Sequence, residues 1–261
     1  MNENVLYDFA DGVATITLNR PQVMNALDAA MIVRLREVCE QAEQDDRARV
    51  ILLRGAGPAF LAGGDVTAFH ADLPRMPERV ADMAGELHRA ILALRRALKP
   101  VVASVHGAVA GAGMSLMAAA DIVIAAADTR FTMAYSRIGA SPDGGSTFFL
   151  PRLIGYQRAM ELMLLSETVE ADTLRSMGLI NRVVPAAELE NKTREVIASL
   201  AAGPTRAYGE TKALANQAYA RSLAEQLDAE AQAFARCAAT RDFAEGVTAF
   251  VEKRKPVFKG E

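Results

Sequence analysis

Hydrophobic and polar positions alternate with short periods in the first part of this 261-residue chain. Alternation at 5–9 and at 13–18 predicts two strands, and the Ala-Asp-Gly between them is typical of a hairpin. Continuous apolar runs at 49–55, 101–105 and 122–126 predict strands that a sheet buries on both faces. The pattern therefore predicts a sheet at the centre of the fold.

Apolar residues at helical spacing predict the elements that cover this sheet. Amphipathic stripes indicate long helices at 27–45 and 78–98. After a last strand at 179–184, every further segment has a helical pattern. Strands alternating with helices, followed by helices alone, are typical of an α/β core with a helical appendage. We expect a core at residues 1–200 and a C-terminal helical region at 201–261.

Composition and charge exclude several function classes. The net charge is −3, from 29 basic and 32 acidic residues, so no basic surface is expected for nucleic acid or anionic lipid. Asp121 and many small residues interrupt the longest apolar stretch, 107–127, which predicts buried elements rather than a membrane span. Cys39 and Cys237 are far apart, with no Cys/His cluster, which predicts a reduced, cytoplasmic protein without a metal site.

Two glycine-rich stretches follow predicted strands, "FLAGGDV" at 60–66 and "VAGAGMSL" at 109–116. Neither matches the glycine spacing of a dinucleotide or phosphate loop. Asp65 is expected to cap a short helix, which leaves the Gly64 N–H free, and the second stretch opens a small-residue helix at 113–120 whose first N–H groups lack partners. Two such donors can form an oxyanion hole. Ordinary turn glycines are the alternative that the residues leave open.

Five stretches in sequence order resemble the crotonase (enoyl-CoA hydratase/isomerase) superfamily over nearly the whole chain. They are "NRPQVMNALDAAM", "RVILLRGAGPAFLAGGDV", "KPVVASVHGAVAGAGMSL", "DIVIAAADTRFTMAYSRIGASPDGGSTFFLPRLIG" and "EGVTAFVEKRKPVFKG". The resemblance implies the crotonase (ClpP-like) α/β fold, a spiral of ββα units with a C-terminal helical trimerisation region. It implies a homotrimer or a hexamer built as a dimer of trimers. It also implies an acyl-CoA thioester substrate and no cofactor, since coenzyme A is part of the substrate.

The resemblance assigns roles to individual residues. Gly64 and Ala112 match the two main-chain donors that hold the thioester carbonyl. The two glutamates of the family's hydratases are matched by Ser115 and Tyr135, which cannot act as carboxylate bases. Asp143 matches the catalytic aspartate of the 2-(1,2-epoxyphenyl)acetyl-CoA and Δ3,Δ2-enoyl-CoA isomerases. The residues alone leave a structural role open for Asp143, because Pro-Asp-Gly is a preferred turn sequence.

An enoyl-CoA isomerase, shifting a double bond or opening a ring epoxide, is the most specific expectation. One carboxylate, Asp143, would act as acid and base, with Tyr135 beside it. An enoyl-CoA hydratase, forming 3-hydroxyacyl-CoA from 2-enoyl-CoA, is the first alternative. His88 and Asp143 also match a histidine and an aspartate of 4-chlorobenzoyl-CoA dehalogenases, so an aryl-CoA dehalogenase or hydrolase stays open as an alternative. From its place beside the Leu87 stripe alone, His88 is by default a histidine at the border of the core. A non-catalytic acyl-CoA-binding assembly protein is the remaining alternative.

The resemblance also implies a wall for substrate and coenzyme A, built from several parts of the chain. Its expected residues are Val23, Asn25, Ala26, Ala62, Gly63, Asp65, Val66, His88, Ser115, Phe258 and Lys259. Phe258 and Lys259 would reach the site of their own or of a neighbouring subunit, where Lys259 would meet the 3′-phosphate. A solvated tail lysine accounts for Lys259 equally well.

Overall fold

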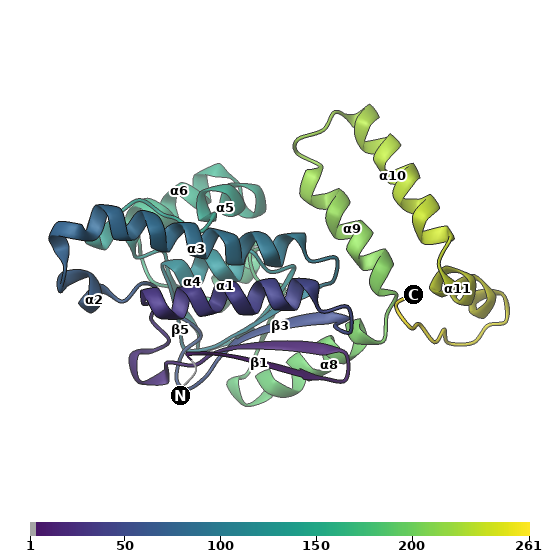
Figure 1. The fold of residues 1–261 in the computed structure, drawn as a ribbon, viewed down its shortest axis with the longest axis horizontal. Coiled ribbons are helices and arrows are strands. Elements are labelled where there is room, and N and C mark those ends of the chain that lie inside the picture. The colour runs from purple at the N-terminus through teal and green to yellow at the C-terminus, as the bar shows by residue number, and fades with distance from the viewer. Residues whose placement is uncertain (1–3) are drawn as a thin grey trace.

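An antiparallel hairpin forms one edge of the main sheet in the computed structural model, which describes residues 4–261 (Figure 1). Strands β1 (Val5–Ala10) and β2 (Val13–Leu18) pair along their whole length. Asp11 and Gly12 connect them with φ angles of 51° and 76°. Positive φ at both central residues belongs to a type I′ turn, which suits Asp-Gly. The hairpin predicted from the alternation is confirmed.

The main sheet has six strands in the order β1-β2-β3-β4-β6-β9, and from β2 onward neighbouring strands run parallel. Its further strands are β3 (Val50–Gly55), β4 (Val101–Val105), β6 (Ile122–Ala126) and β9 (Arg182–Val184). Three of these match the predicted apolar runs. β9 is shorter than predicted because Leu179 and Ile180 are buried ahead of the strand rather than paired within it.

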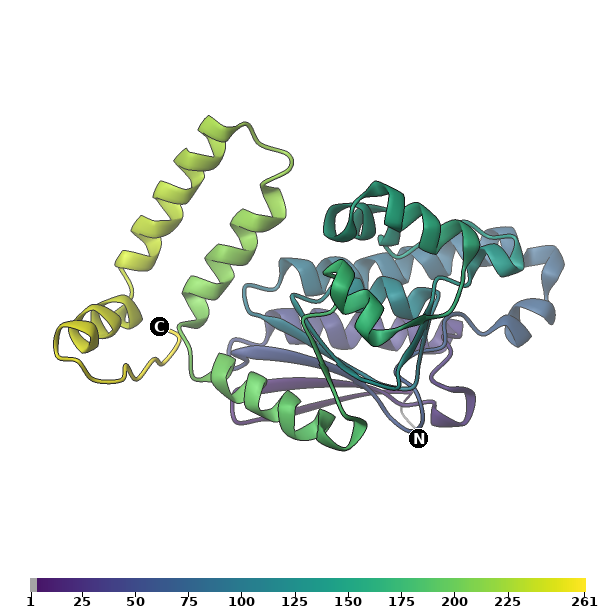
Figure 2. The ribbon, with the colours of Figure 1, turned by 180° about the vertical axis from the view of Figure 1, so that it is seen from behind.

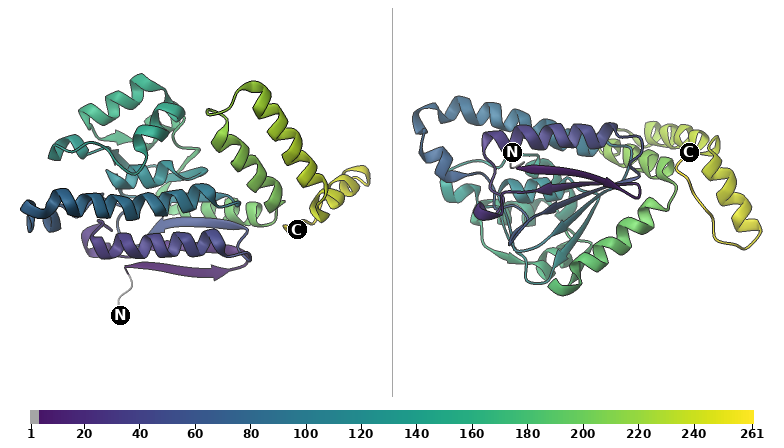
Figure 3. Two further views of the ribbon diagram at one scale, coloured as in Figure 1. Left: turned by 45° about the horizontal axis from the view of Figure 1, so that its top comes forward. Right: turned by 60° about the horizontal axis from the view of Figure 1, so that its bottom comes forward.

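Helices cover both faces of this sheet (Figures 1 and 3). α1 (Ala29–Gln44) and α3 (Met76–Arg96) lie side by side on one face, and α8 (Leu189–Ala201) lies on the other. Ile51 and Leu53 of β3 belong to the core under α1, whereas Val50 and Leu52 pack with Val196 of α8. This two-sided burial is the reason that β3 is a continuous apolar run.

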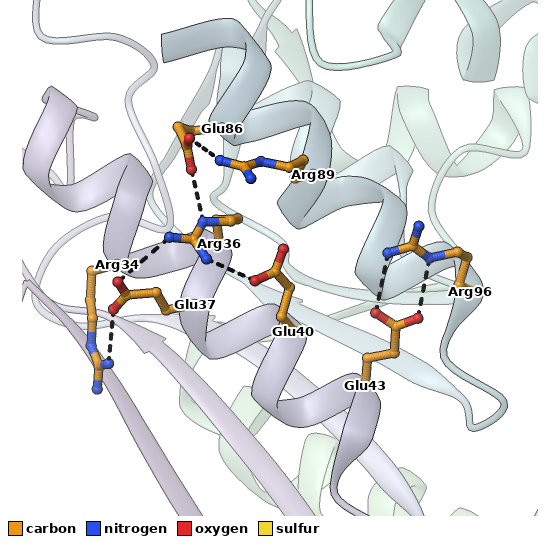
Figure 4. Close-up of polar contacts among 8 residues, drawn as sticks. All are labelled: Arg34, Arg36, Glu37, Glu40, Glu43, Glu86, Arg89 and Arg96. Carbon is orange, nitrogen blue, oxygen red and sulfur yellow. Dashed lines mark hydrogen bonds and ion pairs between the residues drawn. The ribbon is translucent and has the colours of Figure 1, made fainter. Parts of the chain in front are cut away.

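The outward surfaces of α1 and α3 are joined by ion pairs (Figure 4). The Arg36 guanidinium lies 2.8 Å from both Glu40 and Glu86, and Arg96 lies 3.2 Å from Glu43. Exposed pairs of this kind typically stabilise a fold by less than about 1 kcal/mol each. The buried apolar stripe between the helices and the sheet therefore carries most of the packing free energy.

A second, smaller sheet lies beside the first. Its strand order is β5-β7-β8. Its strands are β5 (Ala108–Ala110), β7 (Arg130–Thr132) and β8 (Val169–Glu170). The sequence did not predict β5, because three residues are too few for alternation to show. A parallel bridge between Leu61 and Val109 ties the chain after β3 to this sheet.

Shorter helices fill the space around the second sheet. They are α2 (Val66–His70), α4 (Ala112–Ala118), α5 (Ser146–Ile154), α6 (Tyr156–Leu165) and α7 (Ala171–Met177). Single 3₁₀ turns lie at Pro21–Val23, Leu73–Arg75, Tyr135–Ile138 and Ala186–Glu188. Within residues 4–261, no helix combines the length and the apolar character needed to cross a membrane.

The last three helices, α9 (Thr205–Gln217), α10 (Leu223–Ala238) and α11 (Arg241–Val251), project away from the sheets (Figure 2). An ion pair and a hydrogen bond of the buried Lys212 join α9 to the core. Its Nζ lies 2.8 Å from Asp121 and 2.7 Å from the Leu94 carbonyl oxygen. α8 ends at Ala201, next to the predicted boundary. The division into 1–200 and 201–261 stays a prediction.

Candidate active site

The two glycine-rich stretches lie side by side. Leu61 pairs with Val109 in a parallel bridge, and the Ala110 N–H donates to the Leu61 carbonyl oxygen at 2.9 Å. Gly64 lies three residues beyond Leu61, and Ala112 lies three residues beyond Val109. The shared register therefore brings Gly64 and Ala112 to the same end of the two stretches.

Gly63 permits this close approach. Its φ of +99° is unfavourable for any residue with a Cβ. A Cβ built there would lie 3.2 Å from the Ala110 carbonyl oxygen and 3.8 Å from the Cα of Gly111. Both the backbone conformation and the neighbouring chain thus require glycine at this position.

The N–H groups of Gly64 and Ala112 have no protein acceptor within residues 4–261. Leu27 bonds to the residues on either side of Gly64, since its N–H donates to Gly63 and its carbonyl accepts from Asp65, and this leaves the Gly64 N–H directed away from Leu27. Ala112 is the first residue of α4, where no preceding turn supplies an acceptor. Two free donors therefore lie close together, as an oxyanion hole requires.

A cluster of polar side chains surrounds Ser115, one turn after Ala112 on α4. The Tyr135 hydroxyl donates to Asp143 Oδ1, and the Ser115 hydroxyl donates to the Asp143 main-chain oxygen at 2.9 Å. The two hydroxyl oxygens are 3.4 Å apart. Burial and the Asp143 carboxylate raise the pKa of Tyr135 above its ordinary value, so the phenol stays a proton donor. The structure thus brings together three of the predicted site residues.

This cluster adjoins the two free amides. Ser115 follows Ala112 by three residues on α4, so both lie on one side of the helix. A Cβ on Gly111 would lie 3.9 Å from Cε2 of Tyr135. The two free amides and the Asp143 cluster are therefore neighbours.

His88 lies beside the same loop. It is exposed on α3, and its Nε2 accepts a hydrogen bond of 3.4 Å from the Gly144 N–H. His88 therefore faces the Asp143 loop from outside the core, which corrects the default expectation of a core-border position. A groove of about 1260 Å³ begins at His88, Gly144 and Gly145 and runs between α3, α5 and α9.

The expected coenzyme A wall divides into exposed and internal residues. Val23 and Val66 are exposed apolar side chains near Gly64, while Ala26 and Ala62 are half-buried there. Asp65 caps α2 by accepting from the Ala68 N–H at 3.2 Å, as the sequence predicted. An apolar ligand surface is available on this side of Gly64, whereas the Asp65 carboxylate is already engaged.

The side chain of Asn25 faces the interior instead of a ligand. It is fully buried, and its Nδ2 donates to the main-chain oxygens of Ala56, Ala59 and Phe60 at 2.8–3.1 Å. Asn25 thus shapes the segment that leads to Gly63. The expected place of Asn25 in the coenzyme A wall stays a prediction, and its main chain rather than its side chain would serve there, because the amide nitrogen is already bonded to three main-chain oxygens.

Arg20 was missed at the sequence level. Its guanidinium lies 3.2 Å from both Asp28 and Asp65 and donates to the Ala26 main-chain oxygen. It therefore joins the 23–27 loop to the start of α2. The signal that could have found it is the arginine of "NRPQVMNALD", which precedes the acidic cap of α1, Asp28, in the same stretch.

Comparisons with known proteins show the family of this chain. The chain matches the enoyl-CoA hydratase/isomerase family over residues 8–261. It is 40% identical to a Rhodobacter capsulatus protein named "probable enoyl-CoA hydratase", over 98% of both chains. It is 38% identical to the 1,2-epoxyphenylacetyl-CoA isomerase of Escherichia coli, over 100% of both chains. The chain therefore belongs to the enoyl-CoA hydratase/isomerase family.

Solved structures of this enoyl-CoA hydratase/isomerase family share the fold. An enoyl-CoA hydratase from Polaromonas sp. JS666 matches with a TM-score of 0.92 at 33% identity, over 98% of this chain and 99% of the other. The predicted crotonase fold and the predicted class of acyl-CoA enzyme are confirmed. Relatives named hydratase and isomerase are almost equally similar, so identity alone does not separate the two activities.

In this enoyl-CoA hydratase/isomerase family member, Phe258 and Lys259 lie against the C-terminal helices. The Phe258 carbonyl accepts from Arg49 at 3.2 Å, and the Lys259 N–H donates to Asp242 of α11 at 2.7 Å. Figure 2 shows the C-terminus beside the base of α9, away from the second sheet. The structure does not bring these two residues to the Asp143 cluster of their own chain.

Proposed function

We propose that this protein is an enoyl-CoA isomerase in which Asp143 is the acid and base. One observation supports the choice most directly: the cluster next to the two free amides contains a single carboxylate, that of Asp143, with hydroxyl groups at Ser115 and Tyr135. Hydration by two carboxylates needs a second acidic side chain at this place. Isomerisation needs one group that removes a proton and returns it.

The proposed reaction begins with a 3-enoyl-CoA thioester whose carbonyl oxygen accepts from Gly64 and Ala112. The Asp143 carboxylate takes a proton from C2, and the electron pair of that C–H bond forms the enolate. The two N–H dipoles stabilise the developing oxyanion more than the neutral carbonyl, which lowers the barrier. The enolate then collapses, C4 takes the proton back from Asp143, and the double bond moves from C3–C4 to C2–C3.

The proposed route uses no metal or organic cofactor, because the thioester supplies the electron sink. The exposed apolar side chains of Val23 and Val66 are suited to the pantetheine arm beside Gly64. The groove that begins at Gly144 and Gly145 offers room for the acyl group. Hydration of a 2-enoyl-CoA is the second candidate, supported by the 40% identity to a relative named as a hydratase.

Asp143→Asn tests the proposal. The variant retains the shape of the side chain and the Tyr135 contact but cannot carry the proton, so we expect the isomerisation rate to fall at least about 1000-fold, in line with losing a general base. Binding of coenzyme A, measured by calorimetry, should stay within about twofold. Wild-type protein that hydrates 2-enoyl-CoA while leaving the double bond of 3-enoyl-CoA in place would refute the isomerase and support the hydratase.

A further inference from the structure

One helix carries both parts of the proposed site. α4 presents the free Ala112 N–H at its first residue and the Ser115 hydroxyl one turn later. Ser115 is fully buried, and its hydroxyl donates to the main-chain oxygen of Asp143 at 2.9 Å. The bond therefore joins the loop that holds the carboxylate to the helix that holds the carbonyl-binding amide.

The packing around this bond leaves room only for a small residue. Gly144 has a φ of +60°, and a Cβ built on it would lie 2.8 Å from the Cβ of Ser115. The next residue, Gly145, also has positive φ, at +80°. The loop after Asp143 thus packs closely against α4. A larger side chain at position 115 would push this loop away from the helix.

Three other side chains bond to Asp143 or its loop, and none of them belongs to α4. Tyr135 donates to the carboxylate from its own 3₁₀ turn, and its hydroxyl lies 3.4 Å from that of Ser115. The Ser146 hydroxyl donates to the same Asp143 main-chain oxygen as Ser115 at 2.9 Å, but Ser146 is the first residue of α5. His88 of α3 accepts from Gly144 across a longer 3.4 Å contact. Among these four residues, only Ser115 bonds Asp143 directly to the helix of the Ala112 amide.

We propose that Ser115 is a positioning residue that fixes the Asp143 carboxylate relative to the bound thioester, so that one carboxylate can reach both C2 and C4. This inference rests on the proposed isomerase function. It assigns Ser115 a role inside the protein, in place of the substrate contact expected from the sequence. It also explains why position 115 is a serine rather than the glutamate of the family's hydratases, because the Asp143 loop occupies the space that a longer side chain would need.

Ser115→Ala removes the bond and keeps the small size. We expect kcat for 3-enoyl-CoA to fall about tenfold, the effect of one lost hydrogen bond in the transition state, with KM changed less than about twofold. In D₂O, the recovered substrate should contain more deuterium at C2 per molecule isomerised, because a misplaced carboxyl group that has exchanged its proton with solvent deuterates C2 more often than C4. Ser146→Ala should reduce kcat less than Ser115→Ala.

Ser104→Ala is the matched control, because Ser104 is also buried and its hydroxyl bonds to that of Thr193 in α8, on the opposite side of the sheet. Its kcat and C2 exchange ratio should equal those of wild type at a similar loss of thermal stability. If Ser115→Ala behaves like Ser104→Ala while Asp143→Asn is inactive, the positioning role is wrong and the isomerase proposal stands. If Asp143→Asn keeps its turnover, the proposed function itself has failed, and the role of Ser115 fails with it.

Discussion

Tyr135 holds one oxygen of the Asp143 carboxylate, and this contact has a measurable consequence. The Tyr135 hydroxyl donates to Asp143 Oδ1 and so orients the carboxylate that moves the proton. Tyr135→Phe removes this donor and should lower kcat about tenfold, the usual size of one lost hydrogen bond to a charged group. Steady-state kinetics with 3-enoyl-CoA check this expectation.

A second tyrosine–aspartate pair provides the control for that measurement. The Tyr7 hydroxyl donates to Asp45, the C-cap of α1, at 2.7 Å, and burial and Asp45 raise the pKa of Tyr7 as well. Tyr7→Phe should leave kcat unchanged. An equal fall of kcat in both variants would show that Tyr135 acts through general stability rather than on Asp143.

Single residues also show where sequence reasoning stops. The cap at Asp65 and the free Gly64 amide follow from local backbone rules, and both agree with the structure. The grouping of Ser115, Tyr135 and Asp143 came from family resemblance, because their proximity depends on how α4 and a 3₁₀ turn pack. The burial of Asn25 could not be predicted, since a polar residue in a loop gives no sign of which main-chain oxygens surround it.

At the scale of elements, the C-terminal tail is attached to α11 by carboxylates. Glu245 accepts from the Val257 N–H at 2.8 Å, and hydrogen bonds from Arg254, the larger cause, and from that N–H lower the pKa of Glu245 from 4.5 to about 2. A carboxyl whose pKa is lower when folded stabilises the docked tail above pH 4.5, and the effect is lost as pH falls toward 2.

Glu245→Gln should therefore lower the hydrogen-exchange protection of the Val257 amide at pH 7, and the difference from wild type should shrink as the pH falls below 4.5. Glu252→Gln is the matched control, since Glu252 pairs with Arg254 at 2.7 Å and no tail N–H donates to it among the described residues. Equal protection in wild type and Glu245→Gln across this pH range would contradict the docking role.

The sequence predicts the bounds of some helices and strands more closely than those of others. The buried strands and the two long helices were predicted to within about two residues, because their apolar periods extend over several turns or pairs. β5 and β8 have three and two residues and exist only through their partners in space. The site depends on the bridge between Leu61 and Val109 of β5. Hydrophobic periodicity does not predict this bridge, and so it could not predict that the two glycine-rich stretches lie together.

At the scale of the whole molecule, the projecting helices expose several large apolar side chains. Leu227 and Phe234 of α10 and Phe250 and Val251 of α11 are 55–85% exposed. Exposed apolar patches of this kind mark association sites. They support the expected homotrimer, or a hexamer of two trimers, in which Phe258 and Lys259 would serve a neighbouring subunit because they do not reach their own Asp143 cluster.

Phe250→Glu tests this assembly. Phe250 is 85% exposed, so the substitution should leave the fold of a single chain intact by circular dichroism, yet a charge in a subunit interface should weaken association at least about tenfold, or ~1.4 kcal/mol. Sedimentation should then show smaller species than the wild-type protein forms. Leu73→Glu should sediment like wild type, because Leu73 is an exposed apolar residue that follows α2, and α2 lies at the opposite end of the molecule from α10 and α11 (Figure 1). Wild-type protein that is monomeric at micromolar concentration would instead mean that Phe258 and Lys259 have no neighbouring site to complete.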